Sequence, residues 1–155
     1  MEAATRARLV EQYRQGPAVV RAALAGAPDA ALDASPAPGE WSARQVVHHL
    51  ADSETMSTIR LRRLLAEDEP LITAYDENAW ARQLHYDRPL ELSLAVFDAV
   101  RASNAELLAS LDGAEWARTG THSDDGVYGV ERWLEIYARH GHDHAEQIRE
   151  ALRSA

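Results

Sequence analysis

The chain of 155 residues contains no cysteine, and all 16 of its basic residues are arginine. Without cysteine it has no disulfide, no thiolate metal ligand and no cysteine nucleophile. Without lysine it has no Schiff-base chemistry of its own. No apolar run approaches the roughly 20 residues of a membrane span, and the first residues lack the apolar stretch of a secretory signal. If the protein catalyses a reaction that needs a strong nucleophile, we expect the nucleophile to arrive as a substrate.

Positive charge is also scarce, because 25 acidic residues outnumber the basic ones and give a net charge of -9. There is no basic run, so we expect neither nucleic acid nor an anionic membrane surface as a partner. The apolar share of 46% and the charged share of 26% are ordinary for a globular protein. The length fits a single domain over residues 1–155 that buries about two-thirds of its unfolded surface. We expect the protein to be cytoplasmic.

Apolar residues recur with helical spacing along most of the chain. Four long helices are predicted, over residues 3–25, 42–66, 90–111 and 130–153, and one short helix over residues 77–83. No segment has the alternation of a strand, and residues 118–129 are expected to be irregular. The pattern predicts an all-α fold, a four-helix bundle with one or two long connections.

Helix-breaking residues mark several boundaries. Gly16-Pro17 is expected to kink or interrupt the first long helix. Residues 26–40 are rich in proline, alanine and glycine, which predicts a connector with at most one short turn of helix. Gly113 is expected to end the third long helix.

Two helix starts have specific capping residues. Ser42 and Gln45 form the S-x-x-Q pattern of a capping box, in which each side chain binds the backbone of the other residue. Asp76 is a suitable N-cap for the short helix.

Three of the seven histidines occupy alternate positions in "YARHGHDHAEQI", residues 137–148. Because each helical residue advances by about 100°, His140 and His144 lie about 40° apart on one face. His142 lies about 200° from His140 and is expected to point outward. Two histidines four residues apart can bind one metal ion. Alternatively, His140 and His144 are core residues that are hydrogen-bonded within the protein and bind no metal.

A third candidate ligand is His49 in "VVHHLADSE". The helical face that carries it is unusually polar and includes Asp52, a candidate catalytic base or a partner that orients an imidazole. Arg60 lies on the same face about 16 Å along the axis. It is expected to pair with a carboxylate or to receive the anionic end of a substrate, and the first role is favoured. His48 lies about 100° away and is expected to be partly exposed.

Other ring side chains are given structural roles. Those in the connection before the third long helix are expected to lock it against the bundle end: Tyr75, Trp80, His85 and Tyr86. His122 is expected to be a loop histidine without a partner. Trp41 and Trp116 are expected in the core.

Three motifs, "WSARQVVHHLADSE", "YDENAWARQLHY" and "YARHGHDHAEQI", together resemble the DinB/YfiT-like superfamily of metal-dependent enzymes. The resemblance extends from about Trp41 to Ile148. It implies an up-down-down-up four-helix bundle, usually a homodimer, that holds a divalent metal ion through three histidines. In this sequence they correspond to His49, His140 and His144. Gly141 stands where the family usually has an apolar residue, so this turn is expected to be looser.

The resemblance also bears on activity. Relatives include thiol S-transferases that use low-molecular-weight thiols and a mycothiol-dependent maleylpyruvate isomerase. The favoured interpretation is therefore a transferase that activates a low-molecular-weight thiol at a three-histidine site. A hydrolase that activates water and a non-catalytic metal-binding stress-response module are the alternatives. Zinc is the favoured ion, with nickel and ferrous iron also compatible.

Overall fold

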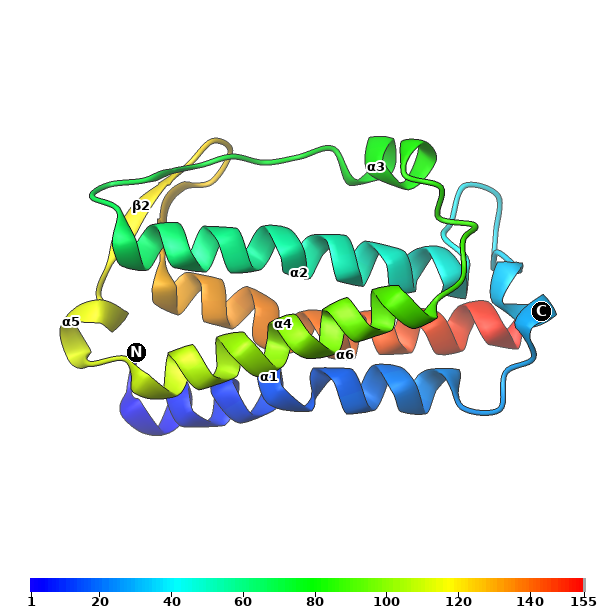
Figure 1. Ribbon diagram of the computed structural model, residues 1–155, viewed down its shortest axis with the longest axis horizontal. Coiled ribbons are helices and arrows are strands. Elements are labelled where there is room, and N and C mark those ends of the chain that lie inside the picture. The colour runs from blue at the N-terminus through cyan, green and yellow to red at the C-terminus, as the bar shows by residue number, and fades with distance from the viewer. Residues whose placement is uncertain (155) are drawn as a thin grey trace.

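The computed structural model describes residues 1–154, which form a four-helix bundle with short elements at its edges (Figure 1). The long helices are α1 (Ala3–Leu24), α2 (Ala43–Ala66), α4 (Glu91–Ser110) and α6 (Val130–Arg153). Helices α1 and α6 run in one direction and α2 and α4 in the other, as the up-down-down-up prediction requires. Helices α4 and α6 each contact both α1 and α2. No helix within residues 1–154 is long and apolar enough to cross a membrane.

The predicted capping residues are confirmed. Ser42 and Gln45 form a complete capping box at the start of α2. Asp76 accepts a hydrogen bond from the backbone of Ala79 and begins α3 (Glu77–Gln83). The connector after α1 contains a short 3-10 helix, η1 (Asp29–Asp33). The prediction for Gly113 is wrong, because α4 already ends at Ser110 and Gly113 begins a separate helix, α5 (Gly113–Trp116).

A small sheet replaces the irregular segment that was expected before α6. Strands β2 (Thr119–His122) and β3 (Gly126–Gly129) form an antiparallel hairpin. Strand β1 (Leu71–Ile72) pairs with β2 in parallel and completes the order β1-β2-β3. Strands of two to four residues are too short to show a clear alternation in sequence.

Helix α1 continues through Gly16-Pro17 without interruption. Proline lacks the N–H that would bind the carbonyl oxygen of Tyr13, and Nη1 of Arg101 from α4 donates to that oxygen at 2.7 Å instead. A Cβ atom on Gly16 would lie 2.1 Å from the same Nη1. Gly141 of α6 is buried opposite, where a Cβ atom would lie 3.2 Å from Cα of Gly16. The expectation of a looser turn at Gly141 is wrong, because the glycine gives close packing there.

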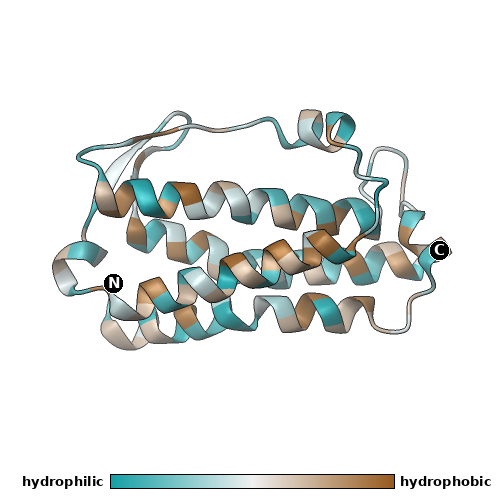
Figure 2. Cartoon of the chain, viewed as in Figure 1, coloured by the Kyte–Doolittle hydropathy of each residue, from teal (hydrophilic) through white to brown (hydrophobic). Residues whose placement is uncertain are grey.

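Two apolar clusters fill the two ends of the bundle. The polar layer between them is centred on the buried ion pair of Arg101 and Glu54, whose Nη2 and Oε1 atoms are 2.7 Å apart. The hydroxyl of Tyr13 donates to the other carboxylate oxygen at 2.9 Å and accepts from Asn104. Hydrophobic and hydrophilic residues are accordingly interspersed along each long helix (Figure 2). A buried pair with every partner in place limits how the four helices can pack.

Candidate metal centre

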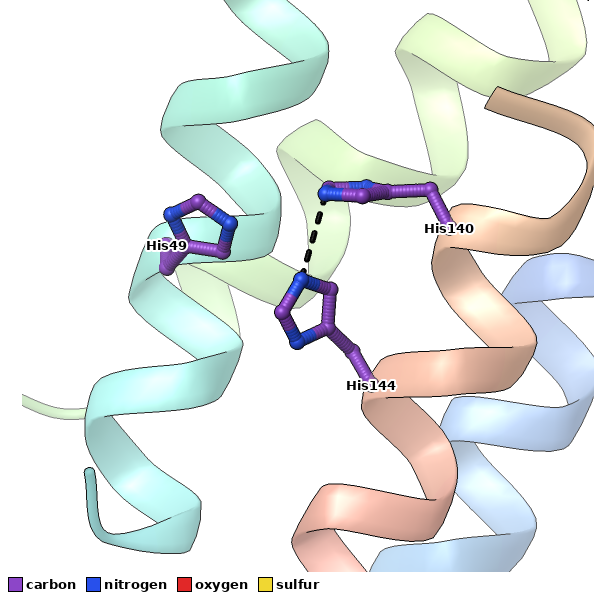
Figure 3. A group of neighbouring side chains, drawn as sticks. All are labelled: His49, His140 and His144. Atoms are coloured by element: carbon purple, nitrogen blue, oxygen red, sulfur yellow. Dashed lines mark hydrogen bonds between the residues drawn. The ribbon is translucent and has the colours of Figure 1, made fainter. Parts of the chain in front are cut away.

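The three histidines selected from the sequence meet between α2 and α6. His49 extends from α2, and His140 and His144 extend toward it from α6 (Figure 3). One ring nitrogen of each lies within 4.8 Å of the others, and the Nε2 atoms of His140 and His144 are 3.1 Å apart. Two nitrogens bound to one tetrahedral zinc ion are about 3.3 Å apart. The spacing therefore fits an ion after a small closing movement of His49.

His49 is only 2% exposed. Its ring packs against Trp41, with the ring centroids 4.7 Å apart. Burial, with a smaller contribution from His144, lowers the pKa of His49 to about 3. The imidazole is therefore neutral at pH 7 and offers a lone pair. Trp41, which was expected in the core, is half-buried: it packs against the apolar cluster at this end of the bundle and covers one side of His49.

His144 is oriented by Gln147, one turn further along α6. The Nδ1–H group of His144 donates to Oε1 of Gln147 at 2.7 Å, which leaves the Nε2 lone pair directed at the other two histidines. Burial lowers the pKa of His144 despite this hydrogen bond. Sequence reasoning assigned no role to Gln147, although its i, i+3 spacing from His144 gives the signal.

His140 completes the group, and its ring packs edge-on against Tyr137 at 5.7 Å between centroids. Burial, reinforced by the other histidines and Arg101, holds the pKa of His140 well below its usual range. Its Nδ1 atom is buried without a hydrogen-bond partner among residues 1–154. Because the lone pair of His144 lies on Nε2, the 3.1 Å contact between the two Nε2 atoms places the proton of His140 on Nε2, and this proton must move to Nδ1 before Nε2 can bind an ion. Three neutral imidazoles with an orphaned nitrogen fit a divalent ion that prefers nitrogen ligands.

The two neighbouring histidines are more buried than expected. His48 is fully buried: its Nε2–H group donates to the carbonyl oxygen of Arg88 at 2.9 Å, and the Ser93 hydroxyl donates to Nδ1 at 2.8 Å. The expectation of partial exposure is wrong because α2 is packed by α3, α4, α6 and η1. His142 does point away from the centre, but it donates to the carbonyl oxygen of Gln12 on α1 at 3.0 Å instead of facing solvent.

The carboxylates of α2 near the triad are already bound. The candidate base Asp52 accepts a hydrogen bond from the Tyr86 hydroxyl at 2.6 Å and is not part of the converging ligand group. Glu54 is held by Arg101. A catalytic role for Asp52 stays a prediction, and it requires the contact with Tyr86 to open.

The connection before α4 is held by aromatic side chains, as expected. Tyr75 and Trp80 pack with ring centroids 4.4 Å apart, and Tyr86 is 3% exposed. His85 takes no part in this packing: it is exposed, and its backbone is left-handed with φ 53° just after α3.

His122 also differs from its prediction. It lies in β2, is 7% exposed, and packs against Tyr128 with ring centroids 5.4 Å apart. Its Nδ1 atom accepts a hydrogen bond from the backbone of Asp124 at 3.3 Å. Trp116 is buried in the core as expected.

Two hollows beside the triad provide space for a ligand. Their volumes are about 600 and 350 Å³, and both are lined by Gly39, Glu40, Trp41 and Asn78. The smaller one also reaches Gln147. None of the three histidines lines either hollow; Trp41 and Gln147, which contact His49 and His144, lie between the hollows and the metal centre.

The sequence matches a known family and is similar to several named proteins. The sequence pattern of the DinB superfamily matches residues 12–148. A relative from Oceanobacillus iheyensis is 38% identical over 117 residues, which are 76% of this chain and 68% of the relative. One from Halalkalibacterium halodurans is 31% identical over 112 residues, which are 72% of this chain and 66% of the relative. Both carry the name "putative metal-dependent hydrolase". The matched region thus spans about two thirds of these relatives.

Two solved structures have the same fold. YfiT from Bacillus subtilis is described as "a probable metal-dependent hydrolase with an unusual four-helix bundle topology". It superposes with a TM-score of 0.92 and 31% identity over 99% of this chain and 89% of its own. The four-helix bundle protein TT2238 superposes with a TM-score of 0.66 and 25% identity, over 93% of this chain and 98% of its own.

Proposed function

Because this chain belongs to the DinB superfamily, we propose that it is a metal-dependent enzyme that acts on a small molecule. His49, His140 and His144 would hold the ion, with zinc the favoured metal and nickel or iron as alternatives. The observation that carries the proposal is the convergence of three neutral imidazoles from two helices. A bound divalent ion supplies Lewis-acid chemistry that lowers the pKa of water or of a thiol beside it.

The surrounding residues have defined parts in this scheme. Gln147 fixes the tautomer of His144, so that its lone pair faces the centre. Trp41 shields one side of His49 from water, which keeps that imidazole neutral. The two hollows that meet at Trp41 give a small molecule a place to bind, and a movement of Trp41 would open them to His49.

Within this class, the geometry favours transfer of a low-molecular-weight thiol to an electrophile. Hydrolysis by an activated water is commonly assisted by a carboxylate base. The nearby Asp52 and Glu54 are bound to Tyr86 and Arg101 respectively. A thiol ionises more readily than water and needs less help from a base. The chain has no cysteine or lysine, so the sulfur nucleophile would come from the substrate.

Hydrolysis is the second candidate, supported by the names of the relatives from Oceanobacillus and Halalkalibacterium and by the description of YfiT. In this case water would be the nucleophile. Asp52 would act as its base after releasing Tyr86.

The two activities are separated by one set of assays on zinc-, nickel- and iron-loaded protein. Glutathione, bacillithiol, mycothiol and coenzyme A are each tested with a model electrophile, and a panel of esters and amides is tested without thiol. We expect turnover only with a thiol, lost in His140→Ala and retained in His142→Ala. Thiol-independent hydrolysis that is lost in His140→Ala would establish the second candidate. If none of His49→Ala, His140→Ala and His144→Ala reduced the amount of bound metal, the metal centre itself would be contradicted.

A further inference from the structure

A separate cavity of about 180 Å³ lies one helical turn from His140 along α6. The connection that leads to α3 passes over α2 (Figure 1), and Ala74 and Tyr75 of this connection line the cavity. Its lining includes Arg60 from α2, Tyr75 and Glu77 from this connection and the start of α3, Tyr128 from β3 and Tyr137 from α6. Tyr137 also packs against His140, so a single ring separates the cavity from the metal centre.

Three polar atoms that line this cavity are buried without a hydrogen-bond partner in the described part of the chain. They are Nε of Arg60 and the hydroxyl groups of Tyr75 and Tyr128, and Tyr128 is only 2% exposed. They make up half of the six such side-chain atoms found in residues 1–154. Buried polar groups are normally paired, so three orphans around one cavity indicate a polar occupant.

Arg60 brings a positive charge to the cavity, and its hydrogen bonds go only to neutral groups. Its Nη1 atom donates to the Tyr137 hydroxyl at 3.2 Å and its Nη2 atom donates to the carbonyl oxygen of Thr73 at 2.8 Å. Both acceptors are neutral, and no carboxylate within residues 1–154 forms an ion pair with this guanidinium. Glu77 and Asp125 line the same cavity and offset part of this charge, but neither forms a direct ion pair with the guanidinium, so an anionic ligand that reached it would gain charge-assisted hydrogen bonds.

Each orphaned group can donate a hydrogen bond, and Nε of Arg60 can only donate. Burial raises the pKa of Tyr75 and of Tyr128, so both phenols keep their protons. The ligand must therefore present acceptors, and a carboxylate matches the geometry of a guanidinium. Glu77 and Asp125 also line the cavity and disfavour a dianion such as phosphate. The volume equals about six water molecules, enough for a carboxylate and a short carbon chain.

We propose that this cavity binds a carboxylate group of the substrate through Arg60, Tyr75 and Tyr128. That the ligand is the substrate rests on the proposed function. In this arrangement the anionic end of the substrate lies beyond Tyr137 and its reacting end lies at the histidines. The binding site itself does not require a metal ion.

Binding is tested in protein freed of metal by chelation, with acetate, propionate and succinate as probes and inorganic phosphate for comparison. Binding is measured by NMR titration. We expect saturable binding of at least one acid and weaker binding of phosphate. Arg60→Gln should weaken binding about tenfold or more, since a hydrogen bond to a charged group is lost. Tyr128→Phe should weaken it several-fold, and Glu77→Gln should strengthen it. Arg62→Gln, on the face of α2 toward Asn104, is the matched control and should have no effect.

Three results would contradict the proposal or its assignment to carboxylates. Absence of saturable binding in the metal-free protein, or binding unchanged in Tyr128→Phe and in Arg60→Gln, would overturn the proposal. Circular dichroism checks that both variants fold, and Tyr128→Phe removes only one oxygen atom. Phosphate binding tighter than every acid would overturn the assignment to carboxylates. His140→Ala should abolish metal binding and leave binding of the acids intact, so the two proposals can fail separately.

Discussion

At the scale of single residues, Gln147 gives the most direct test of the metal centre without removing a ligand. Its side chain binds Nδ1 of His144 and thereby fixes the nitrogen that faces the other histidines. Partners of this kind typically change metal affinity by about 10- to 100-fold. We expect Gln147→Ala to weaken zinc binding by about tenfold, measured by competition with a chromophoric chelator. Glu150→Gln is the control on the same helix, and an equal effect of both variants would contradict the role of Gln147.

The pKa of His49 predicts how the metal-free protein responds to acid. In the folded state this pKa is about 3, against an ordinary value of 6.5, so between these values only the unfolded chain takes up the proton. The unfolded state binds more protons there, and stability therefore falls as pH falls below about 6.5. At pH 5 the loss from this one histidine is about 2 kcal/mol.

Urea unfolding of chelated protein at about pH 7.5 and about pH 5 measures this loss. His49→Gln should lose about 2 kcal/mol less than the unchanged chain between the two pH values, because it lacks the titrating group. An identical loss in both proteins would show that His49 keeps an ordinary pKa in the fold.

The residue scale also shows what helical phase can predict. His140 and His144 were predicted to share one face because four residues advance a helix by about one turn. The prediction needs only a regular helix, and α6 is regular over this segment. The exposure of His48 and His142 depends on how many elements surround each helix. The sequence of one helix carries no such information, so the exposure predicted for His48 was wrong and the contact of His142 with α1 was not foreseen.

At the scale of helices, Gly16 is the position where α1 makes room for the buried arginine of α4. A methyl group there would lie 2.1 Å from Nη1 of Arg101, which is held by Glu54 and by two backbone carbonyl groups. We expect Gly16→Ala to lower the free energy of unfolding by about 3 kcal/mol, because it disturbs a buried ion pair. Urea denaturation measures the loss. Gly113→Ala has open space around its added carbon and should change stability little, and a similar loss in both variants would refute this explanation.

The long helices were predictable because their determinants are local. Ser42 with Gln45 and Asp76 set the start of α2 and α3 through contacts within four residues. The hairpin of β2 and β3 was missed because strands of four residues are too short to show an alternation, and the pairing of β2 with β1, about 50 residues earlier in the chain, is not a local feature. The continuity of α1 through Gly16-Pro17 could not be predicted for a related reason. The effect of this pair on α1 depends on Arg101, a residue from another helix.

At the scale of the whole molecule, the fold should survive removal of the metal. The two apolar clusters occupy the ends of the bundle and include none of the three histidines. We expect helical circular dichroism to be unchanged by a chelator. Zinc at about 100 times its Kd should stabilise the protein by about 2.7 kcal/mol and raise the Tm by about 5 to 10 °C. Loss of helicity on chelation would show instead that the ion is structural and would favour a non-catalytic metal-binding protein.

His49 and His140 are separated by about 90 residues of chain, yet their rings are neighbours. An ion held by both would link α2 to α6 across this length of chain, as a disulfide links distant segments in other proteins, for as long as both histidines stay bound. The centre would then be a reversible cross-link in a chain without cysteine. Helices α2 and α6 could separate only after a histidine releases the ion, so the exchange rate of the metal would set a limit on how fast the loaded protein unfolds.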